Sequence, residues 1–230
     1  MTEIFAVNTS ELMNELDLKL MSLYLSSKKK MFIDKLRCVE DKKRSICSEL
    51  LVRWLINKRL HLKNEEIHFE YNEFGKPFLK EYEKFYFNIS HSGEWIVCAV
   101  SPCEVGIDIE QIKDINLLIA NRFFSKKENI DLNYKNEDDK LDYFYDLWTL
   151  KESYLKYLGK GLSISLQSFS IRKERNDIVI LESFDNRKPN FRQYELDNNY
   201  KLSVCSDDKL LDSEHLIIQL DSKQIFRELY

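Results

Sequence analysis

Apolar residues recur at helical spacing in three long stretches of the chain. Residues 10–26 carry leucines three or four positions apart, and residues 40–60 carry a stronger apolar stripe that includes Trp54. Residues 140–158 repeat the pattern and end at Gly159, a residue suited to stop a helix. Because this spacing lines one face of a helix, it predicts three helices, with shorter ones after Ser26 and at residues 117–124.

Shorter stretches alternate between apolar and polar residues, which is typical of strands. In the first half of the chain they predict strands at residues 67–71, 85–89, 95–100 and 105–110, with a turn at 74–77. In the second half they predict strands at residues 169–171, 178–181, 194–196, 201–205 and 216–220. Helices and strands are mixed without a regular βαβ alternation, so the predicted class is α+β.

An internal similarity predicts two halves. Residues 95–101 and 200–206 share their apolar alternation and a closing serine, and each half carries one long predicted helix. The step from Pro102 to Cys103 is the predicted boundary, which gives an N-terminal half of residues 1–102 and a C-terminal half of residues 103–230.

The composition is that of an ordinary globular protein of 230 residues, 43% hydrophobic and 32% charged. No apolar run is long enough to span a bilayer, and the N-terminus shows no signal-peptide pattern. The five cysteines are scattered and form no CxxC pair, which favours reduced thiols in the cytoplasm over a zinc site or a disulfide framework.

Charge is unevenly distributed along the chain. The net charge of −4 argues against a general nucleic-acid binder. The N-terminal quarter is nevertheless rich in basic residues: Lys28, Lys29, Lys30, Lys35, Arg37, Lys42, Lys43 and Arg44. Each of them alone fits a solvated helix face, whereas the cluster as a whole suits one compact anion such as a phosphate.

Two carboxylates share one face of an apolar strand. In the strand at 105–110, Asp108 and Glu110 alternate with apolar residues and therefore point to the same side. They repel each other unless a cation lies between them, and Mg²⁺ prefers such oxygen ligands. The alternative is an exposed acidic strand edge.

A third carboxylate lies on the apolar stripe of the helix at 140–158. Glu152 follows Trp148 by one turn, and Lys156 follows Glu152 by another. An ordinary Glu–Lys pair on an exposed face would explain this spacing. The position beside Trp148 favours a third metal ligand or a proton acceptor, with Lys156 facing bound phosphates.

His91 lies between two serines after the strand at 85–89. A lone histidine there is usually structural, and no GxSxG motif supports a serine hydrolase. Ser90 and His91 beside Gly93 suit contact with the phosphate or ribose of a ligand.

These motifs together resemble the 4′-phosphopantetheinyl transferases of the surfactin-synthetase-activating type. The resemblance runs in order from about Leu25 to about Cys205 and rests on residues 87–92, 106–110, 122–125, 148–156 and 159–162. It implies a monomer of two similar α/β halves related by a pseudo-twofold axis. It also implies transfer of the phosphopantetheine arm of coenzyme A to a serine of a carrier protein, with release of adenosine 3′,5′-bisphosphate.

The resemblance also implies roles for individual residues. The residues that resemble Mg²⁺ ligands, with Mn²⁺ as an alternative ion, are Asp108, Glu110 and Glu152. Glu152 is also the first candidate base for the serine proton, and Glu128 is the second. The residues that resemble contacts to coenzyme A are Lys156 for its phosphates, Lys29, Arg44 and His91 for the 3′-phosphate, and Gly75, Lys76, Pro77 and Ser90 for adenine and ribose.

Some points stay open in the sequence. Phe32 stands where the family usually has a second lysine, so Lys28 or Lys35 would have to assist in phosphate binding. The pathway of the carrier, whether of a peptide synthetase, a polyketide synthase or a fatty acid synthase, is not readable from the residues. The alternative functions are a metal-dependent nucleotide phosphodiesterase and a non-catalytic binder of a carrier protein or nucleotide.

Overall fold

The computed structural model describes residues 1–10, 15–174, 177–183, 185–211 and 217–229. The elements up to residue 101 are β1 (Glu3–Asn8), α1 (Glu15–Ser22), α2 (Ser27–Lys35), α3 (Val39–Leu60), β2 (Glu70–Tyr71), β3 (Pro77–Phe78), β4 (Tyr86–Ser92) and β5 (Trp95–Ser101). Those that follow are β6 (Val105–Gln111), α4 (Ala120–Phe123), α5 (Lys126–Asn133), α6 (Glu137–Leu158), β7 (Ser170–Lys173), β8 (Ile178–Glu182), β9 (Asn190–Tyr194), β10 (Tyr200–Ser206), β11 (Ile217–Leu220) and α7 (Ser222–Leu229). Short 3₁₀ turns connect several of them.

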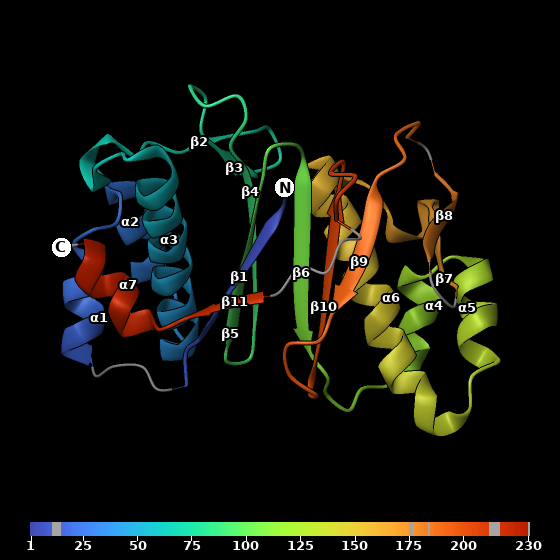
Figure 1. Cartoon of the computed structure of the whole chain (residues 1–230). Coiled ribbons are helices and arrows are strands. Elements are labelled where there is room, and N and C mark those ends of the chain that lie inside the picture. The colour runs from blue at the N-terminus through green and yellow to red at the C-terminus, as the bar shows by residue number, and fades with distance from the viewer. Residues whose placement is uncertain (11–14, 175–176, 184, 212–216, 230) are drawn as a thin grey trace.

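The strands form two main sheets in the middle of the molecule. The first has the order β11-β1-β5-β4 and the second the order β6-β10-β9, and every pair is antiparallel except β1 with β11. In Figure 1 the helices α3 and α7 lie on one side of the strands, and α6, α4 and α5 lie on the other. The protein is thus a mixed α and β fold whose helices enclose two sheets.

The alternation of side chains along β5 explains this layering. Ile96, Cys98 and Val100 belong to the core beneath α3, whereas Val97 and Ala99 belong to a core shared with strands of the second sheet. Because successive strand residues face opposite sides, one strand contributes to both cores. The seven residues of β5 are all buried, as expected of a strand covered on both faces.

The two halves are similar in construction. Each has a helix of 22 residues, α3 or α6, packed on a sheet whose interior strand has seven residues, β5 or β10. These interior strands are the two stretches whose similarity is visible in the sequence. Side chains also join the halves, since the Asn88 Oδ1 of β4 accepts a hydrogen bond from the Ile107 N–H of β6 at 2.9 Å.

The end of the described chain returns to the first half. The strand β11 pairs in parallel with β1, and α7 then packs near α3, where Glu228 accepts hydrogen bonds from Lys58 and Trp54. This differs from the predicted grouping of all residues 103–230, because residues 217–229 complete the first sheet and its helical layer. The boundary between residues 102 and 103 itself stays a prediction.

Most predicted elements correspond to observed ones. Both long helices and the strands at 95–100, 105–110 and 201–205 are present, and Gly159 ends α6 in the left-handed conformation with a φ of 67°. The helix predicted at 10–26 is described only as α1, since residues 11–14 lie outside the described residues. The predictions omitted β1, α5 and α7, and they placed β9 four residues too late. They also placed His91 after a strand, whereas β4 continues to Ser92.

None of the described helices combines the length and the apolar character needed to span a bilayer.

Candidate active site

The candidate site lies where β4 of the first half runs beside β6 of the second. The hydroxyl of Ser90 donates a hydrogen bond to Asp108 Oδ1 at 2.9 Å, and that of Ser92 donates one to Glu110 Oε2 at 2.7 Å. The residues on both strands are two apart, so each pair faces the same side. The predicted acidic face of β6 is therefore confirmed as one face, and residues of the neighbouring strand orient both carboxylates.

Glycine allows α6 to approach this face closely. A Cβ atom at Gly106 would meet backbone atoms of Ser153, Lys156 and Tyr157, so any larger residue would push α6 from β6. A glycine inside a strand indicates that another part of the backbone approaches closely, and here that part is the helix α6. This contact places Glu152 and Lys156 over the carboxylates of β6.

A cavity of about 560 Å³ contains most of the predicted site. It is lined by Lys29, Phe32, Ser45, Ser48, Ile89, Ser90, His91, Asp108, Glu110, Trp148, Glu152 and Lys156. These residues come from α2, α3, β4, β6 and α6, so both halves of the chain contribute. The structure brings together seven predicted residues that are spread over the chain from Lys29 to Lys156.

Asp108 is the most constrained acid of the site. Its side chain is only 5% exposed, and Lys156 Nζ lies 2.7 Å from its Oδ1 atom. The same ammonium donates a hydrogen bond to Ser90 Oγ at 2.7 Å. Burial raises the pKa of Asp108 in spite of Lys156 and Ser90, which act in the opposite direction. Its Oδ2 atom is buried and has no hydrogen-bond partner, which leaves one carboxylate oxygen available to another ligand.

The three carboxylates act on one another electrostatically. Burial, and then the charge of Asp108, raises the pKa of Glu110. Burial and the charges of Asp108 and Glu110 raise the pKa of Glu152 to about 7, with Lys156 opposing them. Like charges at this range disfavour each other's ionised form, so a cation among them would be stabilised. As the side chains stand, no three His, Cys, Asp or Glu residues in the described part of the chain form a group that could hold a metal ion.

A cluster of cations lies at the His91 end of the cavity. Partial desolvation, and then the charges of Arg44, Lys156 and Lys29, lower the pKa of His91. Lys29 is in the first turn of α2, where the Ser26 hydroxyl accepts a hydrogen bond from the Lys29 backbone N–H at 3.2 Å. Arg44 donates a hydrogen bond to the Gly93 carbonyl at 3.1 Å. The arrangement suits an anion, because the charges of Lys29, Arg44 and Lys156 all act on His91, although Arg44 also forms an ion pair with Asp41.

Of the residues predicted around adenine and ribose, only Ser90 lines the main cavity. Lys76 and Pro77 line a smaller cavity of about 270 Å³, and Gly75 is exposed on the adjoining turn with a φ of 89°. The Lys76 ammonium donates hydrogen bonds to Glu104 at 3.0 Å and to the Tyr157 carbonyl at 3.4 Å near the C-terminus of α6. The side chain of Lys76 therefore connects the two halves.

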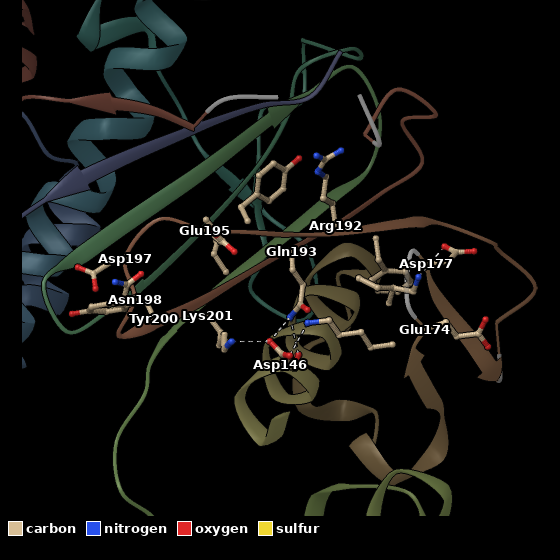
Figure 2. A pocket seen from close by; sticks show the side chains of 15 residues that line it. Asp146, Glu174, Asp177, Arg192, Gln193, Glu195, Asp197, Asn198, Tyr200 and Lys201 are labelled. Atoms are coloured by element: carbon tan, nitrogen blue, oxygen red, sulfur yellow. Dashed lines mark hydrogen bonds and ion pairs between the residues drawn. The ribbon is translucent and has the colours of Figure 1, made fainter. Parts of the chain in front are cut away.

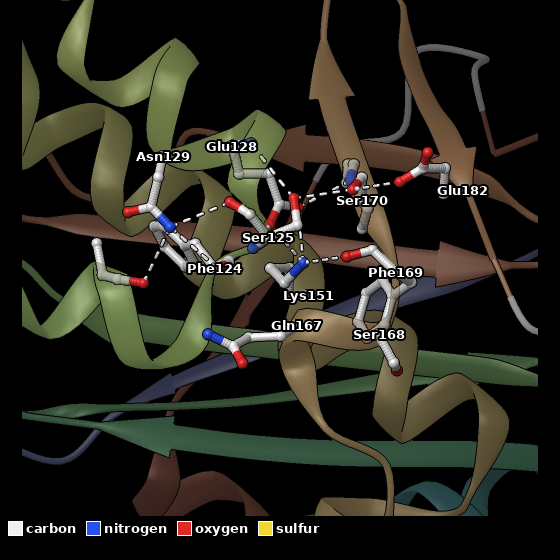
Figure 3. Close-up of polar contacts among 12 residues, drawn as sticks. Phe124, Ser125, Glu128, Asn129, Lys151, Gln167, Ser168, Phe169, Ser170 and Glu182 are labelled. Carbon is white, nitrogen blue, oxygen red and sulfur yellow. Dashed lines mark hydrogen bonds and ion pairs between the residues drawn. The ribbon is translucent and has the colours of Figure 1, made fainter.

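Glu128 does not line the cavity. Its carboxylate forms a buried ion pair with Lys151, with Nζ 2.6 Å and 2.7 Å from the two oxygens (Figure 3). Because this pair is almost fully shielded from solvent, Glu128 has no free oxygen directed to a serine in the cavity. The structure thus corrects the prediction of Glu128 as a second base.

Several residues of the cavity were not predicted. Phe32, Ser45, Ser48 and Ile89 line it, as does Trp148, which was interpreted as core. Ser45 and Ser48 are one turn apart on α3, outside its apolar stripe, and small polar residues at that spacing were the available signal. The Ser48 hydroxyl is buried without a hydrogen-bond partner.

A larger cavity of about 870 Å³ lies on β9 and β10, away from the predicted residues (Figure 2). Its most buried acid, Asp146, forms ion pairs with Lys173 at 2.7 Å and Lys201 at 3.3 Å and accepts a hydrogen bond from Gln193. These contacts satisfy Asp146, which therefore has no buried unpaired oxygen like that of Asp108.

Comparisons with known families cover most of the chain. Residues 104–205 match the model of the 4′-phosphopantetheinyl transferase superfamily. Residues 14–103 match the model described as 4′-phosphopantetheinyl transferase, N-terminal. The two matches meet next to the predicted boundary between the halves.

Individual relatives agree with these families. The chain is 45% identical to 4′-phosphopantetheinyl transferase Sfp of Bacillus subtilis over 73% of this chain and 75% of the relative. It is 39% identical to 4′-phosphopantetheinyl transferase psf-1 of Bacillus pumilus over 85% and 84%. A holo-(acyl-carrier-protein) synthase of Bacillus anthracis, solved with CoA (3′,5′-ADP), shows 15% identity and a TM-score of 0.40 over 46% of this chain and 97% of that one. A TM-score this low supports no argument about function.

Proposed function

The chain belongs to the 4′-phosphopantetheinyl transferase family, and from that premise we propose that it transfers the 4′-phosphopantetheine arm of coenzyme A to a serine of an apo carrier protein. Adenosine 3′,5′-bisphosphate is the product that leaves. The observation that carries the proposal is the cavity in which three carboxylates, a lysine and a cluster of cations meet between the two halves.

We assign the phosphates of coenzyme A to the basic residues of the cavity. Lys29, Arg44 and His91 would bind the 3′-phosphate. The charges of Lys29 and Arg44 are near enough to His91 to lower its pKa. Lys156 would bind the pyrophosphate, and Asp108 and Ser90 hold its ammonium in place. The turn of Gly75, Lys76 and Pro77, together with Ser90, is proposed for the adenine and ribose.

The chemistry of the donor set suits a Mg²⁺ ion, with Mn²⁺ as an alternative, and the three carboxylates would have to turn toward one another to hold it. Asp108, Glu110 and Glu152 offer only oxygen ligands, which hard divalent cations prefer. The unpartnered Asp108 Oδ2 and the raised pKa values of all three acids support a cation there. When bound, the ion would supply positive charge that offsets the negative charge on the pyrophosphate.

Glu152 is proposed as the base for the carrier serine. The serine oxygen forms a bond to the phosphorus of the phosphopantetheine, the bond from that phosphorus to the bridging oxygen breaks, and the hydroxyl proton passes to Glu152. Glu152 lines the cavity together with Asp108 and Lys156, so its ionised carboxylate is placed to accept that proton from a serine that enters the cavity. Lys156 would remain beside the leaving phosphate, where charge develops.

We further propose that the protein acts as a monomer in the cytoplasm. Both halves of a single chain line the cavity, so no second copy is needed to complete it. The five cysteines are free thiols, which suits a reducing compartment. The carrier would be an apo domain of a peptide synthetase, a polyketide synthase or a fatty acid synthase.

The test is transfer to a panel of apo carrier proteins. The protein is incubated with coenzyme A, MgCl₂ and each carrier, and mass spectrometry records addition of the phosphopantetheine mass. We expect Asp108→Asn to abolish the addition and Asp114→Asn, an exposed acid just after β6, to leave it unchanged. The proposal would be contradicted if none of the carriers in the panel were modified, or if adenosine 3′,5′-bisphosphate were released without a carrier.

A further inference from the structure

A buried ion pair behind the active site joins three elements. Lys151 is 0% exposed and Glu128 is 1% exposed. The ammonium donates hydrogen bonds to both oxygens of Glu128 and to the Phe169 carbonyl, the last at 2.8 Å. The pair therefore connects α6 to the start of α5 and to the residue before β7, as Figure 3 shows.

The carboxylate of Glu128 is equally well satisfied. It accepts hydrogen bonds from the backbone N–H groups of Ser125 and Ile171, each at 2.8 Å, in addition to Lys151. The hydroxyl of Ser170 donates a further hydrogen bond to Ser125 Oγ at 2.8 Å. A group whose donors and acceptors are all used in one geometry has little freedom to turn.

Lys151 directly precedes Glu152 on α6. Consecutive residues of a helix project about 100° apart, so a lysine fixed on one side determines where its neighbour points. Lys151 is directed to Glu128, whereas Glu152 and Lys156 line the cavity. A rotation of α6 about its axis would break the ion pair and turn both cavity residues together.

We propose that the Lys151–Glu128 pair is a positioning device that sets the rotation of α6 and so aims Glu152 and Lys156 at the reacting phosphate. The inference rests on the proposed transferase function. The pair touches neither substrate nor ion, and its effect passes through the helix. A displacement of about 1 Å is enough to reduce a catalytic rate by about a hundredfold.

The test uses a double variant that removes the anchor and leaves no unpaired buried charge. Lys151→Met or Glu128→Gln alone leaves a charge buried without its partner, and such variants are expected to be unstable. The double variant E128Q/K151M removes both charges, and the Glu128→Gln amide keeps an acceptor for the Ile171 N–H. The Ser125 N–H and the Phe169 carbonyl lose their present partners in this variant. Lys127→Met is the matched control, because Lys127 directly precedes Glu128 in the chain but forms an exposed ion pair, with Glu182 at 2.7 Å.

We expect E128Q/K151M to stay folded, with a melting temperature lowered by about 2–12 °C because two buried backbone groups lose their partners, and to lose kcat by about tenfold or more. The KM for coenzyme A should rise by a smaller factor than kcat falls, because only Lys156 moves with α6, whereas Lys29, Arg44 and His91 lie on other elements. A stable double variant with the kcat of the wild type would overturn the proposal. So would a double variant that does not fold, or an equal loss of kcat in Lys127→Met.

A second measurement is independent of transfer. Trp148 lies one turn before Glu152 and packs on Phe123 with ring centroids 5.2 Å apart. With Trp54 and Trp95 replaced by phenylalanine, acrylamide quenching of Trp148 emission reports the rotation of α6. Relative to the wild type, we expect quenching to become about 1.5-fold stronger or weaker in E128Q/K151M and to stay the same in Lys127→Met. Quenching that is unchanged in both variants would overturn the proposal. If the wild type did not modify any carrier, the proposed transferase function itself would be wrong, and the quenching result would still test the positioning of α6.

Discussion

Replacement of Gly106 by alanine tests how strictly β6 and α6 must fit together. A Cβ at this position would lie 2.9 Å from the Lys156 carbonyl carbon, and nearer still to backbone atoms of Ser153 and Tyr157. Ordinary contacts begin at 3.4 Å, so the Lys156 contact alone requires a movement of 3.4 − 2.9 = 0.5 Å. All three obstacles are backbone atoms of a packed helix, so relief requires α6 itself to shift.

The expected magnitudes follow from that shift. Overpacking of a core costs about 1–3 kcal/mol, which lowers the melting temperature of a chain of this size by about 2–12 °C. Because the shift separates Lys156 and Glu152 from Asp108, transfer should fall by about ten- to a hundredfold even at temperatures where the variant is folded. Circular dichroism gives the melting temperature, and carrier modification followed by mass spectrometry gives the rate.

Gly161→Ala is the control for this experiment. Gly161 has a φ of 51° and no atom within 4 Å of the added Cβ, so alanine introduces backbone strain without a clash. That strain costs about 1–2 kcal/mol. We expect the control to lose some stability and to keep its transfer rate. A Gly106→Ala protein that transfers as fast as the wild type would refute the reasoning that the close contact positions the site.

Three further predictions concern the charged residues of the cavity. The pKa of Glu152 is raised from 4.5 to about 7, so the folded chain holds this proton more tightly, and stability should fall as pH rises between these values. Urea unfolding across this range should show a flatter pH dependence in Glu152→Gln, and an unchanged slope would contradict the assignment. Lys29→Ala should raise the KM for coenzyme A several-fold more than the KM for its 3′-dephospho form, as steady-state kinetics would show, because Lys29 belongs to the cationic cluster at His91. Lys156→Met should abolish transfer and yet strengthen Mg²⁺ binding to the substrate-free protein in calorimetry, because the Lys156 ammonium, 2.7 Å from Asp108 Oδ1, would repel a cation at the unpartnered Oδ2 of the same carboxylate. Weaker Mg²⁺ binding in that variant would oppose the assignment.

Local patterns predicted the elements that build the site. The alternation along β6 correctly placed Asp108 and Glu110 on one face, and the helical spacing placed Glu152 and Lys156 one turn apart. Such patterns depend only on the period of the strand or helix and are therefore readable without tertiary contacts. The family resemblance, which the comparisons confirmed, rests on the same local motifs.

Long-range pairing was not readable in this way. Glu128 had the residue type of a base, but its side chain is paired with Lys151 on the far side of α6. Likewise, β11 joins β1 across more than two hundred residues of sequence. No local period encodes which buried charge faces which partner, because that choice depends on how separate elements pack.

The sequence by itself determined the two acidic motifs, their faces and the family. Only the tertiary structure decided that Ser90 and Lys156 hold Asp108 between the two halves, and that Gly106 serves the contact with α6. The physical reason is that periodicity specifies the direction of a side chain relative to its own element. The neighbour it meets is specified by the packing of two sheets and two long helices, which leaves one oxygen of Asp108 without a partner.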